Sequence, residues 1–109
     1  MKRGDIVSVV VAGEFGKPRP AVVVQADKLS KVVGSVLVSL VTTHRSGTPL
    51  FRVPVEPTRE NGLLQPSEIM VDKIMAISQS KIGGVIGSLD DETMQRLNRT
   101  LAFVIGLGQ

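Results

Sequence analysis

The sequence predicts an α+β domain that is mainly β, with short strands followed by one C-terminal helix. Two observations carry this prediction. Seventeen residues are valine, most of them in the first half, and the β-branched runs are short and punctuated by Gly and Pro, as in compact β structure. After residue 90 the apolar residues recur at helical spacing instead. A chain of 109 residues fits one domain, so a single domain over 1–109 is expected.

Five strands are expected from the apolar runs. They cover residues 5–11, 20–26, 34–42, 50–55 and 69–78. The third carries Val and Leu at both alternating sets of positions, which predicts that both of its faces are partly covered. Pro54 has no backbone N–H, so the fourth strand is expected at a sheet edge or a bulge. Two connections rich in Gly, Pro and charge, 12–19 and 43–49, are expected to be loops.

The C-terminal helix has the clearest pattern. Asp90 is a suitable N-cap, Leu89 and Met94 occupy the positions of a hydrophobic staple, and Gly106 can end the helix. The apolar residues expected on its inner face are Met94, Leu97, Leu101, Val104 and Ile105. This face should pack on a strongly curved antiparallel sheet.

Composition excludes several classes of protein. The chain has no cysteine, which excludes a disulfide scaffold, a thiol nucleophile and a cysteine-based zinc site. The chain also has a single histidine, so neither a metal ion nor another cofactor is expected. Apolar runs such as Ala21–Val24 are far too short to span a membrane, and Gly4-Asp5 directly follows the basic start, so no signal peptide is expected. A cytoplasmic protein with no membrane partner is the expectation.

Charge is distributed unevenly along the chain. The net charge is +3, but residues 1–53 hold eight Lys or Arg against three acids, and residues 54–109 hold five against seven. A basic half can attract phosphates, although an ordinary solvated surface explains the same charges. Three Phe and no Tyr or Trp make a platform of several base-stacking aromatics a poor fit.

Two loop segments contain residues suited to phosphate chemistry. In the first, Phe15-Gly16-Lys17-Pro18-Arg19-Pro20, the prolines restrict the backbone around Arg19, whose planar guanidinium can bind two phosphate oxygens. The alternative is a rigid strand entry whose arginine forms a structural ion pair. The second, Val41-Thr42-Thr43-His44-Arg45, ends a strand with two hydroxyls and a histidine, a side chain that can act as an acid or a base. Asp72-Lys73, inside the last predicted strand, is a further candidate or a solvent-facing pair.

The order of these segments resembles the MazF/PemK (Kid) family of toxin endoribonucleases, or mRNA interferases, of bacterial toxin–antitoxin modules. The resemblance spans nearly the whole chain. It rests on Arg3-Gly4-Asp5-Ile6-Val7, Arg19-Pro20-Ala21-Val22-Val23-Val24, Val41-Thr42-Thr43, Gly62-Leu63, Val71-Asp72-Lys73-Ile74 and Ile86-Gly87-Ser88-Leu89-Asp90-Asp91-Glu92.

The resemblance implies an SH3-like barrel of the CcdB/MazF type, with about five to seven strands and a C-terminal helix. It also implies a homodimer and a cognate antitoxin partner with an acidic disordered tail. The implied activity is metal-independent cleavage of single-stranded RNA, leaving 2′,3′-cyclic phosphate and 5′-hydroxyl ends.

The site residues follow from the same resemblance. Arg19 and Thr42 are expected to be catalytic, with Thr43 as the alternative threonine. Asp72 and His44 are the candidate acid/base groups. The expected RNA contacts are Phe15, Gly16, Lys17, Pro18, Thr43, Arg45 and Lys73. Two competing interpretations are a non-enzymatic gyrase poison like CcdB, which the absence of Trp disfavours, and an RNA- or protein-binding barrel whose site has decayed.

Overall fold

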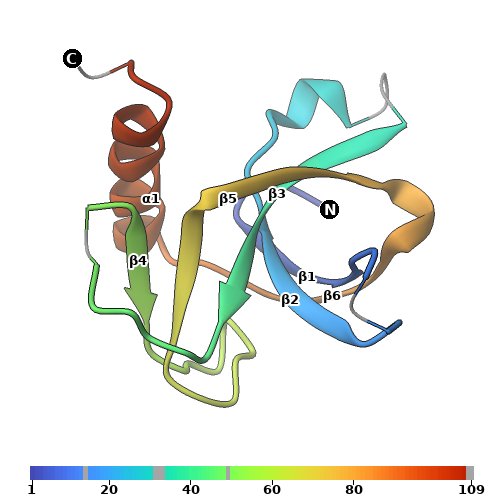
Figure 1. The fold of residues 1–109 in the computed structure, drawn as a ribbon, viewed down its shortest axis with the longest axis horizontal. Helices are drawn as coiled ribbons and strands as arrows, with labels where there is room; N and C mark the ends of the chain where they lie inside the picture. Colours follow the sequence, from blue (N-terminus) through green and yellow to red (C-terminus); the bar gives the residue numbers. More distant parts are fainter. Residues whose placement is uncertain (14, 31–33, 49, 108–109) are drawn as a thin grey trace.

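The computed structural model describes residues 1–13, 15–30, 34–48 and 50–107. Six strands form one antiparallel sheet in the order β4-β5-β3-β2-β1-β6, with a C-terminal helix beside it (Figure 1). The elements are β1 (Asp5–Val10), β2 (Pro18–Val23), β3 (Ser35–Thr42), β4 (Arg52–Val55), β5 (Ser67–Ser78), β6 (Ile82–Ser88) and α1 (Asp91–Val104). The long β5 curves from α1 across to the opposite side of the molecule. The predicted mainly β fold with a C-terminal helix is confirmed.

The five predicted strands are all present, with shifted ends. β4 is a terminal strand of the sheet and its Pro54 is exposed, as expected for a proline at an edge. Leu50 and Phe51 precede this strand instead of opening it, and β2 starts two residues earlier than predicted, at Pro18. Glu14 and Pro49, in the two predicted loops, lie outside the described residues.

Two hydrophobic clusters form because neighbouring residues of each strand point to opposite faces of the sheet. The helix-side cluster, which packs against α1, contains Ile6, Val22, Val41, Val53, Val55, Leu63, Ile69, Val71 and Leu97. The other, the barrel cluster, contains Val7, Val9, Ala21, Val23, Val36, Val38, Leu40, Met70 and Ile77. The prediction that both faces of the third strand are partly covered is therefore confirmed, because β3 contributes to both clusters while its Leu37 stays exposed.

The sixth strand, β6, is not predicted by the sequence, because Gly83, Gly84 and Gly87 interrupt its apolar pattern. It pairs with β1 on one side and meets a loop on the other, where the Ser88 N–H donates to the Glu60 carbonyl at 2.9 Å. A Cβ on Gly87 would lie 2.4 Å from that carbonyl oxygen. The glycine that weakens the strand signal is therefore what allows the loop to pack against this edge.

Helix α1 begins and ends as the sequence predicts. The Asp90 carboxylate accepts a hydrogen bond from the Thr93 N–H at 2.7 Å. At the other end Gly106 adopts φ +81°, and the Leu107 N–H donates to the Ala102 carbonyl at 2.7 Å. This hydrogen bond spans five residues of the chain and is characteristic of a Schellman motif, which ends a helix at a left-handed glycine.

The buried face of α1 is narrower than predicted. Leu97 is fully buried, and Met94, Leu101 and Val104 pack partly buried against the helix-side cluster. Ile105 is 56% exposed, because it forms the C-cap, where the helical repeat has already ended. No helix within the described part of the chain is long and apolar enough to cross a membrane.

Candidate active site

Arg19 lies near the start of β2 and reaches across to the end of β3. Pro18 and Pro20 flank it, and Pro20 keeps the Arg19 backbone extended. One guanidinium nitrogen, Nη2, donates to the Val41 carbonyl oxygen at 3.1 Å. The charged group is therefore held beside the last residue of β3, which is Thr42.

Arg19 and Thr42 also share one face of the sheet. Ala21 pairs with Leu40, so Arg19 and Thr42 each lie two residues farther toward the same end of the strand pair. Residues two apart on a strand point to the same face of the sheet. Arg19 and Thr42 therefore lie on the face of the barrel cluster, to which Ala21 and Leu40 belong. The Thr42 hydroxyl oxygen accepts the His44 N–H at 3.1 Å, and an accepting hydroxyl still carries an O–H donor. The pair can present a cationic and a neutral donor to one ligand.

Thr43, the alternative threonine, is exposed on a different surface. Together with Pro20, Leu64 and Gln65 it lines a separate pocket of about 380 Å³. Of the two threonines, Thr42 is the one that directly follows the carbonyl bound by Arg19.

A buried carboxylate that the sequence interpretation missed lies beside Thr42. Glu68, the register partner of Thr42 on β5, is 3% exposed. Its Oε1 accepts the Ser46 N–H at 3.0 Å and the Ser46 hydroxyl at 2.8 Å. The same oxygen accepts from Nη1 of Arg52, on β4, at 3.1 Å. Glu68 therefore fastens the loop that follows Thr42 to its own strand β5 and to the edge strand β4.

Arg52 bridges two carboxylates on this face. Besides Glu68 it binds Asp72, with Nε and Nη2 at 3.1 and 3.4 Å from the two carboxylate oxygens. Its register partner is Met70, so Glu68 and Asp72 lie two residues to either side along β5. The alternate spacing 68-70-72 could have suggested one shared face, but nothing in the sequence pointed to Arg52 as the common partner.

These contacts shift the ionisation of both partners. Burial alone would raise the pKa of Glu68, but the hydrogen bonds from Ser46 and the charge of Arg52 outweigh it, so the pKa lies below its ordinary value. The hydrogen bond to Asp72 is the main reason that the pKa of Arg52 is raised, against the opposing effect of burial. Both groups are thus held in their charged forms.

The remaining predicted residues are dispersed around this network. Arg45 donates to Glu56 at 2.6 Å and to the Val55 carbonyl at 3.3 Å, which ties it to the end of β4. His44 is exposed in the same loop. Lys73 is exposed, and as the neighbour of Asp72 in a strand it points to the other face of the sheet. The structure therefore does not bring Asp72 and Lys73 together.

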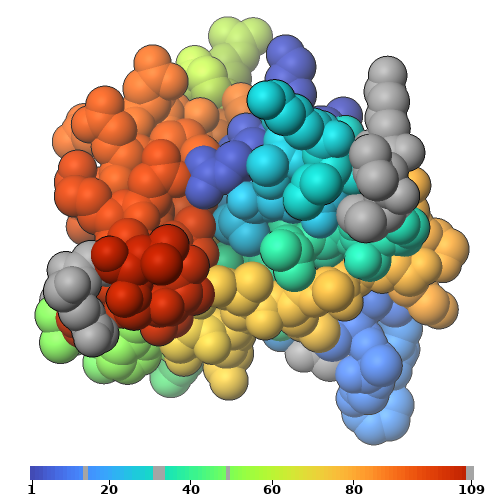
Figure 2. Space-filling view, turned by 90° about the horizontal axis from the view of Figure 1, so that it is seen from above, coloured from blue at the N-terminus to red at the C-terminus, as the bar shows by residue number. Residues whose placement is uncertain are grey.

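Of the predicted RNA contacts before Arg19, Phe15, Gly16 and Lys17 lie in the β1–β2 loop, which projects from the body of the molecule (Figure 2), and Pro18 begins β2. Phe15 is 98% exposed and has φ +55°, an unusual backbone conformation for a residue other than glycine. Gly16 follows with φ +73°, and Lys17 and Pro18 are exposed. The loop presents an aromatic ring and a cation on the approach to Arg19.

No three His, Asp or Glu side chains gather into a possible metal site in the parts of the chain that the structure covers. The chemistry available here comes from arginine, hydroxyl, imidazole and carboxylate groups. Such a set suits the stabilisation of a phosphate that gains negative charge.

The comparison with known proteins decides the family. Residues 2–105 match the family described as PemK-like, MazF-like toxin of type II toxin-antitoxin system. This chain belongs to that toxin family. The match confirms the resemblance predicted from the sequence and favours it over a CcdB-like gyrase poison.

Individual relatives agree with the assignment. The toxin is 35% identical to the probable endoribonuclease MazF of Mycolicibacterium smegmatis, over 98% of each chain. Its fold matches Mycobacterium tuberculosis toxin MazF-mt6 with a TM-score of 0.81 and 25% identity, over 94% of this chain and 97% of that one. A mycobacterial endoribonuclease solved in complex with its cognate antitoxin has the same fold, with a TM-score of 0.83 at 22% identity, over 98% and 96% of the two chains. The predicted class, a toxin of the endoribonuclease type, is confirmed.

Proposed function

We propose that this toxin cleaves single-stranded RNA without a metal ion, by attack of a ribose 2′-hydroxyl on the adjacent phosphate. The observation that carries the proposal is the guanidinium of Arg19, held at the Val41 carbonyl beside Thr42. The names of relatives support the substrate class, and the basic half of the chain supports attraction of a polyanion.

In the proposed reaction the 2′-oxygen forms a bond to phosphorus while the bond from phosphorus to the 5′-oxygen breaks. The 2′-hydroxyl proton passes to a general base, and the departing 5′-oxygen takes up a proton. The products are a 2′,3′-cyclic phosphate and a 5′-hydroxyl. Negative charge accumulates on the non-bridging oxygens. The hydrogen bonds that Arg19 and the Thr42 hydroxyl donate to these oxygens therefore become stronger in the transition state.

Two groups can serve as the general base. Asp72 lies four residues along β5 from Glu68, the partner of Thr42, which corresponds to about 13 Å of extended chain. Both of its oxygens are also engaged by Arg52. His44 follows Thr42 by two residues and binds its hydroxyl through the backbone. Proximity therefore favours His44, with Asp72 as the alternative.

Not all of the predicted RNA contacts are equally well placed. Phe15–Pro18 are exposed on the approach to Arg19, and Thr43 is exposed on the neighbouring surface that includes Pro20, and we retain them as contacts. Arg45 is paired with Glu56 at 2.6 Å, so an RNA phosphate would have to compete with that carboxylate. Lys73 points to the opposite face of the sheet, so it can contact only an RNA strand that wraps around the sheet.

Cleavage is expected to persist in excess EDTA, because the proposed transition state is stabilised by Arg19 and Thr42. The measurement is digestion of a long single-stranded RNA with and without the chelator. The 3′ ends should resist poly(A) polymerase until phosphatase treatment removes the cyclic phosphate. Activity that disappears with EDTA and returns with magnesium would assign the toxin to another mechanism.

We also propose that a cognate antitoxin silences the toxin in the cytoplasm through an acidic, disordered tail. The two site loops belong to the basic half of the chain, which attracts such a tail. The neighbour solved with its antitoxin supports a partner of this kind. We propose that residues 1–109 act as one domain in this complex.

The toxin is expected to be a homodimer at micromolar concentration. Leu37, Ile105 and Leu107 are 41%, 56% and 75% exposed and line one apolar groove with Leu101, a surface that favours burial against a second copy. Sedimentation velocity measures the state. Ile105→Glu should give a monomer, whereas Leu64→Glu, which adds the same charge at another exposed leucine, should not. A monomeric wild-type protein would contradict the proposal.

A further inference from the structure

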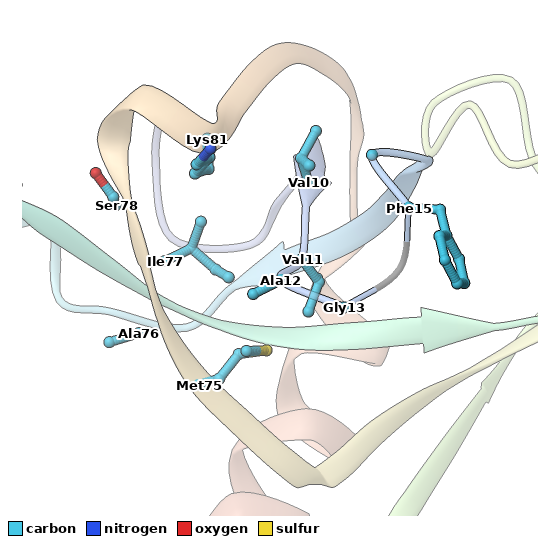
Figure 3. Close-up of a pocket in the computed structure, with 11 residues that line it drawn as sticks. Val10, Val11, Ala12, Gly13, Phe15, Met75, Ala76, Ile77, Ser78 and Lys81 are labelled. Atoms are coloured by element: carbon cyan, nitrogen blue, oxygen red, sulfur yellow. The ribbon is translucent and has the colours of Figure 1, made fainter.

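An apolar pocket of about 610 Å³, named here the loop pocket, opens between the β1–β2 loop and the end of β5 (Figure 3). Its lining consists of Val10, Val11, Ala12, Gly13, Phe15, Gly16, Met75, Ala76, Ile77, Ser78 and Lys81. Among the described residues that line the pocket, Lys81 is the one with a formal charge, and that charge is positive. The volume lies in the range of small-ligand sites, which are mostly apolar with a few orienting polar groups.

The loop pocket is continuous with the face that carries Arg19. Residues at the edge of the barrel cluster line the bottom of the pocket. Ile77 belongs to that cluster, and Val11 and Met75 pack against it. Val9, the register partner of Arg19, precedes Val11 by two residues. Two residues of extended chain span about 7 Å, so the pocket begins one short step from the candidate phosphate site.

The walls of the loop pocket suit a flat, partly apolar group. Met75 and Ile77 face Val11 and Ala12 across the opening, and Phe15 lies farther along the loop, beyond Gly13 (Figure 3). Phe15 is 98% exposed, so its ring face is available to stack on a ligand. Stacking on an aromatic side chain is a general way to hold a base of a single strand.

We propose that the loop pocket binds the nucleobase next to the phosphate held by Arg19. The inference rests on the proposed function, since it adds a base subsite to the same RNA strand. Lys81 supplies three N–H donors and no acceptor, so it can pair with O6 of guanine or O4 of uracil but not with the amino group that adenine and cytosine carry at that position. The subsite therefore prefers guanine or uracil to adenine or cytosine, and it contributes to the choice of cleavage position.

Nucleotide binding tests the loop pocket without any cleavage. GMP, UMP, AMP and CMP are titrated into ¹⁵N-labelled toxin, and the amide signals of residues 11–16 and 75–81 are followed by NMR. GMP and UMP should shift these signals at lower concentration than AMP and CMP. Phe15→Leu, which removes the ring but keeps an apolar side chain, should weaken GMP binding about tenfold. Shifts confined to other regions, or no shifts, would overturn the proposal.

Matched variants test the pocket walls. Ala12→Trp should fill the cavity and abolish the GMP-induced shifts, whereas Ala26→Trp, at an exposed position outside it, should leave them. Lys81→Gln should remove the preference for GMP and UMP, and Lys28→Gln should keep it. Unchanged binding in Ala12→Trp would reject the site. Shifts caused by an acidic apolar peptide but by none of the nucleotides would identify a protein-docking surface and also reject it.

Mapping of cut sites connects the pocket to cleavage. On an RNA of random sequence the wild-type toxin should show a preference for G or U at one position flanking the cut. Lys81→Gln should relax that position alone, with Lys28→Gln as the control. An unchanged preference in Lys81→Gln would overturn the subsite. Retained GMP binding in a protein that cuts no RNA would reject the proposed function and still support the pocket.

Discussion

Replacing Arg19 with alanine is expected to lower the rate of RNA cleavage by about 10²–10³-fold, the usual cost of removing one donor to a developing oxyanion. The protein should remain folded, because the Arg19 side chain is partly exposed and is not part of either hydrophobic cluster. Arg19→Lys should recover little activity, since an ammonium lacks the planar fork that binds two phosphate oxygens. Initial rates on a fluorogenic single-stranded RNA measure both effects.

Arg99→Ala is the matched control, because it removes the same charge from an exposed position on α1 and should leave the rate unchanged. Thermal melts of both variants check that they fold. Thr42→Val should lower kcat more than Thr43→Val, since only Thr42 lies beside the arginine-bound carbonyl. Wild-type cleavage by Arg19→Ala, or loss of its folded state, would rule out the role assigned to Arg19.

The elements whose signals are local could be predicted from the sequence. The N-cap at Asp90, the glycine at 106 and the edge position of Pro54 each depend on the backbone chemistry of one residue and its near neighbours. β6 could not be predicted in this way. Its glycines make the local sequence a poor match to a strand. The loop around Glu60, whose close packing requires a glycine at position 87, lies more than twenty residues away in sequence.

The residues of the candidate site also differ in whether the sequence could predict them. Arg19 and Thr42 could be selected because they belong to conspicuous motifs, and the register of β2 and β3 supports their association. Glu68 and Arg52 could not, because a charged residue in a strand ordinarily faces solvent. Their pairing depends on which strands adjoin in the folded sheet, where β4 and β3 lie on opposite sides of β5. Which charge is buried is thus decided by topology.

Glu68 is expected to contribute the largest single electrostatic effect on stability. Glu68→Ala leaves Arg52, whose side chain is 14% exposed, without one of its two carboxylates and removes the anchor of Ser46. The free energy of unfolding should fall by about 3 kcal/mol, the lower end of the cost of breaking a buried pair, because Arg52 keeps Asp72. Urea denaturation at pH 7 measures the change. Cleavage should fall too, since the anchored loop carries His44.

The pH dependence distinguishes this role from simple packing. Because the pKa of Glu68 is lower in the folded than in the unfolded chain, its contribution is complete above the unfolded value of about 4.3 and is lost as the pH falls through the folded value. Glu68→Gln keeps the shape without the charge, so its stability should decline less than that of the wild type as the pH falls below the unfolded value. Glu60→Gln, at an exposed carboxylate, should follow the wild-type curve. If the curves of Glu68→Gln and the wild type run parallel, the buried carboxylate is not what holds the loop to β5 and β4.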